Sequence, residues 1–136
     1  MPLVAQRFGA TVQGLLSFWS GDIAMPDELP IRAFKTRAEL RIWLEAHHDS
    51  HKGLWVRIFK AGAGKPSVTF TEVLDEGLCF GWSESTRRAD DDESYLQKFT
   101  PRRTRGTVSA RNKAHAKQLI ADGLMTPAGL HALGMT

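Results

Sequence analysis

Cys79-Phe80-Gly81-Trp82 marks the point where this 136-residue chain changes from one kind of secondary structure to another. Before it, apolar residues recur at helical spacing from Val73 to Leu78 and predict a helix over about 71–80. After it, side chains alternate as they do in a strand. Because glycine adopts backbone conformations that interrupt a helix, Gly81 is the natural boundary between the two elements.

Two strands joined by an acidic turn are predicted after this boundary. The first runs from Trp82 to about Arg88. The second spans 94–100 and ends at Pro101, which cannot donate a ladder hydrogen bond. Asp90–Glu93 supplies the polar turn between them. A β-hairpin is therefore expected near the middle of the chain.

The flanking segments predict the remaining elements of an α+β fold. Thr36 and Glu39 form a capping-box pattern, and Gly123 is a natural helix stop. The predicted elements are a helix at 37–48, a largely buried strand at 54–60, a helix at about 107–121 and a short helical piece from Pro127. Their order predicts a small antiparallel sheet with a central hairpin, packed by three to four helices.

Length and composition limit the class of protein. A chain of 136 residues, 42% apolar and 24% charged, suits one ordinary hydrophobic core. No apolar run reaches the ~18 residues of a membrane-spanning helix, and the first residues lack a secretory signal, so a cytoplasmic protein is expected. The single cysteine, Cys79, cannot form an internal disulfide or complete a thiolate metal cage. We interpret it as a small buried apolar group.

Residues 1–28 differ from the rest and are interpreted as an N-terminal arm, which leaves 29–136 as the domain proper. Short apolar pieces are interrupted by glycines, and only 11–19 has the spacing of a short helix. Three interpretations stay open. The arm could dock through Phe18 and Trp19, mediate contact in a homodimer, or partly reflect a start codon placed too far upstream.

Positive charge is concentrated after the hairpin. The net charge is only +3, yet residues 94–121 contain no acid. The basic residues of this stretch are Lys98, Arg102, Arg103, Arg105, Arg111, Lys113 and Lys117. Guanidinium groups bind carboxylate or phosphate through paired donors, and the amides of a helix start near Thr107 would also attract anions. This predicts a site for an acidic ligand, an anionic lipid head group or a phosphate. Alternatively, the arginines could pair with Asp90–Glu93 or Glu84 within the fold.

The residues predicted to bind a ligand are Lys60, Trp82, Glu84, Arg88, Tyr95, Lys98, Arg102 and Arg103. One alternative is a small enzyme whose pocket holds the Trp, Glu, Arg and Tyr of this set, with Glu84 or Tyr95 handling a proton. Another is a single-stranded nucleic-acid binder, in which exposed aromatic rings beside the arginines stack on bases. The position of these rings in strands favours a core role and argues against nucleic acid.

Three further motifs have structural interpretations. Gly62–Lys65 resembles a phosphate-binding loop only weakly, because Pro66 follows where such a loop needs Ser or Thr. His47 and His51 could share a helix face, but the helix dipole favours histidines in a last turn without any metal. We therefore expect no metal and no cofactor. Glu76 lies well inside its predicted helix and could be buried against an arginine.

A longer pattern of residues extends from about 29 to 134. It comprises Trp55-Val56 through Lys60, Gly64-Lys65-Pro66-Ser67, Glu76-Gly77-Leu78-Cys79-Phe80-Gly81-Trp82, Tyr95, Phe99-Thr100-Pro101-Arg102-Arg103, Ser109, Asn112, and Gly123-Leu124-Met125-Thr126-Pro127-Ala128-Gly129. In this pattern the chain resembles the YdeI/OmpD-associated family, also called bacteriocin-protection proteins. It departs at Ser83-Glu84-Ser85, where the family has Ile-Asp-Gly, and at Val108, where the family has tryptophan.

The resemblance implies a bacterial role in stress or in resistance to antimicrobial peptides. It implies no reaction, cofactor or catalytic residue. Together with the cationic cluster, it leads us to expect a non-enzymatic domain that binds an anionic small molecule or an acidic protein segment.

Overall fold

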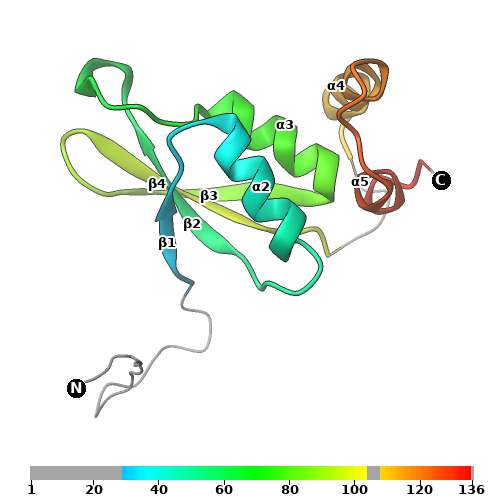
Figure 1. Cartoon of the computed structure of the whole chain (residues 1–136), viewed down its shortest axis with the longest axis horizontal. Helices are drawn as coiled ribbons and strands as arrows, with labels where there is room; N and C mark the ends of the chain where they lie inside the picture. The colour runs from blue at the N-terminus through cyan, green and yellow to red at the C-terminus, as the bar shows by residue number, and fades with distance from the viewer. Residues whose placement is uncertain (1–28, 104–107, 136) are drawn as a thin grey trace, which may run out of the picture.

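The computed structural model of the protein describes residues 29–103 and 108–135 (Figure 1). Its elements are β1 (Ile31–Ala33), α2 (Arg37–His47), β2 (Leu54–Phe59), the 3₁₀ helix η2 (Ala61–Ala63), α3 (Phe70–Phe80), β3 (Trp82–Ala89), β4 (Ser94–Pro101), α4 (Ala110–Ala121) and α5 (Pro127–Ala132). The predicted α+β class is confirmed. The predicted arm at 1–28, its helix at 11–19, and Arg105 lie outside the described residues.

The strands form one sheet in the order β1-β2-β4-β3. β3 and β4 form the predicted hairpin, and β4 also pairs antiparallel with β2, so Phe99 lies opposite Leu54 on one side and Glu84 on the other. The antiparallel pairing predicted for the sheet holds for β2, β3 and β4, whereas β1 pairs parallel with β2, so the sheet is mixed. β1 has only three residues, all exposed, and so short a segment has no alternation from which a strand could be predicted. It forms a strand because it pairs with the edge of β2.

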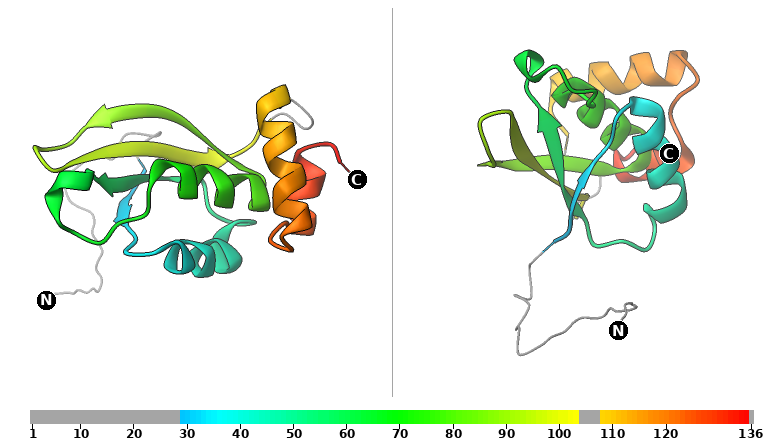
Figure 2. Two further views of the ribbon diagram at one scale, coloured as in Figure 1. Left: turned by 90° about the horizontal axis from the view of Figure 1, so that it is seen from above. Right: turned by 60° about the vertical axis from the view of Figure 1, so that its left-hand side comes forward.

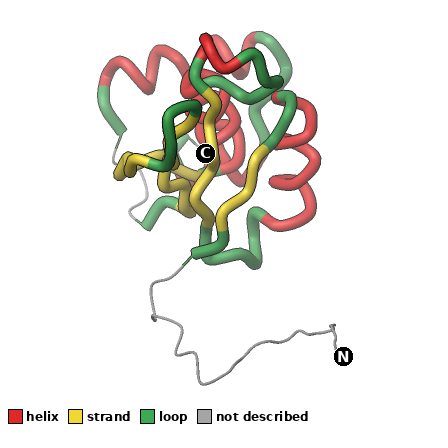
Figure 3. Tube along the Cα trace, turned by 90° about the vertical axis from the view of Figure 1, so that its left-hand side faces the viewer, coloured by secondary structure: helices red, strands yellow, loops and turns green. Residues whose placement is uncertain are grey.

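Helices α2 and α3 lie on one face of this sheet, and α4 and α5 pack at one end of α3 (Figures 1 and 2). Figure 3 shows the same arrangement with helices and strands in separate colours. Among the described residues, the other face carries no helical layer, and we call it the helix-free face. Its outward-facing residues on β2, β3 and β4 include Trp55, Arg57, Ser83, Ser85, Arg88, Leu96, Lys98 and Thr100.

The hydrophobic core lies between the sheet and its helices. Leu54, Val56 and Ile58 alternate toward the helices from β2, as the period of a strand requires. The aromatic rings of Trp82 and Phe99 meet there with centroids 5.1 Å apart. These buried side chains come from both strands of the hairpin, so the core cannot form without the hairpin.

Capping residues determine where α3 begins and ends. Thr69 and Glu72 form a complete capping box, and Gly81 ends the helix in a left-handed conformation with φ of 77°. At the predicted box before α2, Thr36 caps the amide of Glu39, but the Glu39 carboxylate accepts from the amide of Lys35. The helix predicted near Thr107 begins at Ala110 in the described residues, capped by Ser109.

A buried ion cluster joins α2 to α3. The Glu76 side chain is fully buried. It accepts hydrogen bonds from Arg37 Nε at 2.5 Å and from Arg41 Nη1 at 3.0 Å. Arg41 Nη2 also donates to the carbonyl of Leu124, at 2.7 Å, and this bond connects α2 to the segment that precedes α5. The expectation that Glu76 is buried against an arginine is therefore confirmed.

Glu76→Gln is expected to lower the free energy of unfolding by about 2–3 kcal/mol, because two partly buried guanidiniums lose their counter-charge. Urea unfolding followed by circular dichroism measures this change. The matched control is Glu45→Gln, since Glu45 is exposed and lies 3.9 Å from Arg41, so its removal should cost no more than about 0.5 kcal/mol. Equal effects of the two variants would contradict the importance of the buried cluster.

Burial raises the pKa of the Cys79 thiol to about 11. We expect a thiol reagent to label Cys79 at neutral pH only when the protein is unfolded in urea, because the reactive thiolate is suppressed in the fold. Above about pH 9 the unfolded chain loses a proton that the folded chain keeps, so stability should fall as pH rises from there. Rapid labelling in native buffer would overturn both expectations.

Candidate anion-binding site

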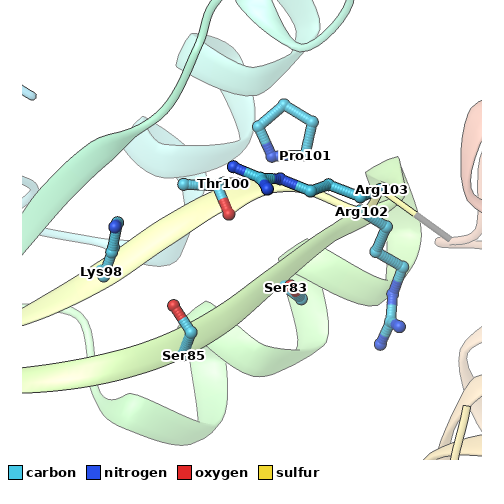
Figure 4. Close-up of a pocket in the computed structure, with 7 residues that line it drawn as sticks. All are labelled: Ser83, Ser85, Lys98, Thr100, Pro101, Arg102 and Arg103. Carbon is cyan, nitrogen blue, oxygen red and sulfur yellow. The ribbon is translucent and has the colours of Figure 1, made fainter. Parts of the chain in front are cut away.

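A cavity of about 400 Å³ lies at the end of the β3–β4 pair, where β4 leaves the sheet. Its lining residues are Ser83, Ser85, Lys98, Thr100, Pro101, Arg102 and Arg103 (Figure 4). A second cavity of about 440 Å³ shares Lys98 and the four residues from Thr100 to Arg103, and adds Leu29 and Lys52. We call the two together the cationic groove. Among the described residues, neither lining includes an acid.

Strand alternation places the polar lining on the helix-free face. Ser83 lies opposite Thr100, and Lys98 lies opposite Trp55, so these side chains emerge on the side away from α2 and α3. A β-bulge between Glu84 and Arg87 interrupts the pairing beside Ser85. The same alternation that buries Phe99 therefore directs its neighbours into the groove.

Gln97 supports this bulge from the inside. Its side chain is almost fully buried, and its Nε2 donates to the carbonyls of Ser85 and Thr86, both at 3.2 Å. These carbonyls would otherwise lack the regular ladder partners of a strand. The arrangement sets the direction of Ser85, which lines the groove.

The cations of the groove differ in their surroundings. Arg103 is exposed, whereas Lys98 and Arg102 are half-buried. Arg102 is held by an interaction within the chain, and its amide donates to the carbonyl of Gly81 at 2.9 Å. The Lys98 ammonium lies 6.0 Å from the centre of the Trp55 ring. Lys98 and Arg103 are thus the cations best placed to meet a ligand.

Two acids of the hairpin turn are paired with cations at the end of the sheet opposite the groove. Asp90 accepts hydrogen bonds from the Ser94 hydroxyl at 2.6 Å and from Arg57 at 2.8 Å, and these bonds hold the pKa of Asp90 below its usual range. Glu93 pairs with Lys65 at 3.3 Å. The turn is separated from Arg102 by the length of β4, on the order of 20 Å. Asp90 and Glu93 are therefore paired with Arg57 and Lys65, which come from other segments of the chain.

The predicted ligand-binding residues lie in three places. Lys98, Arg102 and Arg103 come together in the groove, and Arg88 lies on the same face, its guanidinium 4.5 Å from the centre of the Trp55 ring. Lys60 lies at the far end of β2 and lines a different cavity, of about 500 Å³, together with Tyr95.

Trp82, Glu84 and Tyr95 project from the helix side of the sheet, opposite Arg88. Trp82 is a core residue, and its indole nitrogen donates to the carbonyl of His48 at 3.1 Å. The ring of Tyr95 is approached by the guanidinium of Arg87, at 4.1 Å, on the helix side. The residues of the predicted enzyme pocket therefore lie on two faces of the sheet.

Several groove residues were missed by sequence reasoning. Ser83, Ser85 and Thr100 alternate with core residues, so the alternation of the strands could have indicated that they lie on the face away from the core. Leu29 and Lys52 belong to segments far apart in the sequence, and no local pattern indicates that they meet.

The other motifs have structural roles. The rings of His47 and His51 both lie 4.9 Å from that of Trp43. Across 29–103 and 108–135, no group of three or more His, Cys, Asp or Glu residues could hold a metal ion. Lys65 of the glycine-rich segment pairs with Glu93 and lies over the Phe59 ring, at 5.2 Å.

None of the helices in the described part of the chain has the length and apolar character needed to cross a membrane.

Comparison with known proteins identifies a family for most of the chain. Residues 32–132 match the family model described as a domain of unknown function, DUF8412. No curated protein and no solved structure matches the chain significantly. The resemblance to the YdeI/OmpD-associated family stays a prediction. Because the matched residues make up most of the sequence, the chain belongs to the DUF8412 family.

Proposed function

We propose that this domain binds an anionic group of a ligand in the cationic groove. The observation that carries the proposal is the composition of the lining. Lys98 and Arg103 line the groove together with the hydroxyl-bearing residues Ser83, Ser85 and Thr100, and the lining residues that the structure describes include no carboxylate. Such a set of donors matches the oxygens of a phosphate, a sulfate or a carboxylate.

The position of the groove supports this role. Lys98 and Thr100 project from a central strand of the sheet, and the amide of Arg102 donates to the carbonyl of Gly81 at the end of α3, so the backbone of these three residues is held in place. Donors held in place lose little conformational entropy when a ligand arrives. Partial burial of Lys98 also reduces solvent screening of its charge.

The proposed role is binding, and we assign no catalytic residue. The resemblance to bacteriocin-protection proteins would place this binding in a cytoplasmic bacterial response to stress or to antimicrobial peptides. An anionic small molecule and an acidic segment of a partner protein are the ligands expected from the sequence.

Calorimetric titration with inorganic phosphate and with sulfate tests the proposal. Arg103→Ala and Lys98→Ala should each weaken binding about tenfold, because each removes a charge-assisted hydrogen bond to the anion. Both side chains reach solvent, so the variants should keep the unfolding midpoint of the parent protein.

Lys113→Ala is the matched control, since Lys113 is an exposed cation on α4 outside the groove. It removes the same charge and should leave the binding heat unchanged. The proposal is wrong if the parent protein gives no heat, or if the groove variants and the Lys113 variant weaken binding equally.

A further inference from the structure

The helix-free face combines apolar surface with cations. Trp55 and Leu96 lie at its centre and are only 9% and 2% exposed. Arg88 lies over the Trp55 ring and is opposite Leu96 in the register. The apolar stems of such side chains cover the sheet while their charges face solvent.

The cationic groove runs across this face instead of forming a single pit. Its first cavity lies toward β3, at Ser83 and Ser85, and its second extends toward Leu29 and Lys52, near the start of β2. Both cavities meet at Lys98 and Thr100 of β4. A single phosphate would occupy one of them, whereas a chain of phosphates could follow both.

The cations are spaced along the sheet as well as across it. Arg88 is paired with Leu96, two residues from Lys98, so the Cα atoms of the two basic residues are roughly 7 Å apart on the diagonal. A flat ring can stack on a guanidinium, and here the guanidinium itself rests on an indole. The face thus offers a stacking position directly beside a phosphate-binding groove.

The hairpin turn limits where a polyanion could lie. Asp90–Glu93 concentrates acidic residues at the end of β3 and β4 that is distant from the groove. Although Arg57 and Lys65 neutralise part of this charge, the turn offers no attraction to a phosphate. A bound strand would therefore cross the Lys98 end of the sheet and would be short, on the order of four nucleotides.

We propose that the anionic ligand is a single-stranded nucleic acid, with its phosphates in the cationic groove and a base stacked on the Arg88–Trp55 pair. This inference rests on the proposed anion-binding function and assigns the ligand class. Phosphate contacts supply most of the affinity, and stacking supplies a contribution that tolerates any base. An oligo-glutamate peptide provides the charge but no ring to stack, so Arg88 distinguishes it from a nucleic acid.

Fluorescence anisotropy with labelled twelve-nucleotide oligo-dT and oligo-rU tests the inference, with the mononucleotides and an oligo-glutamate peptide as comparison ligands. The oligonucleotides should bind at least tenfold more tightly than either. Arg103→Ala should lower the dependence of log affinity on log salt by about 0.7 for each phosphate that the variant no longer neutralises. Arg88→Ala should weaken oligonucleotide binding about fivefold or more, and by a clearly larger factor than it weakens binding of inorganic phosphate.

Each outcome decides the matter. If phosphate binds the groove but oligonucleotides bind no more tightly than mononucleotides, the inference fails and the anion-binding function stands. If oligo-glutamate binds as well as oligo-dT and Arg88→Ala changes neither, the partner is an acidic protein segment and the inference fails. If phosphate, oligonucleotides and oligo-glutamate all fail to bind, both proposals fall.

Trp55→Leu with a retained unfolding midpoint provides a second stacking variant. An unchanged oligo-dT affinity in this variant would also overturn the inference.

Discussion

The buried carboxylate of Glu76 is the constraint on which the arrangement of the helices depends. A charge removed from solvent must be compensated, and the guanidiniums of Arg37 and Arg41 do so here. Because these arginines are four residues apart on α2, the whole helix is held against α3. The bond from Arg41 to Leu124 extends the same constraint to the C-terminal helices.

Holding α2 and α3 together on one face of the sheet determines the character of the other face. Successive side chains of a strand point to opposite faces of the sheet, so β4 contributes residues both to the core and to the cationic groove. Phe99 packs into the core beside Trp82, while Lys98 and Thr100 emerge into the cationic groove. A one-residue slip of β4 would exchange these roles, and the register with β2 is therefore as important to the site as the residues themselves.

The distribution of charge on the sheet supports the binding role that we assign to the groove. Asp90 and Glu93 are satisfied locally, by Arg57 and by Lys65, at the hairpin end. These acids are the nearest in sequence to the arginine cluster, yet cations from other segments of the chain neutralise them. A formal net charge of only +3 conceals this separation of signs.

The α+β class, the hairpin and the burial of Glu76 were predictable from sequence, because helical spacing, strand alternation and the break at Gly81 are local signals. The cluster at Lys98, Arg102 and Arg103 was visible for the same reason. Tertiary structure alone decided that β1 joins in parallel, that Lys52 reaches the groove, and that Trp82 and Arg88 lie on opposite sides of the sheet. These outcomes depend on strand order, register and a bulge, which arise from pairing between segments that no local pattern connects.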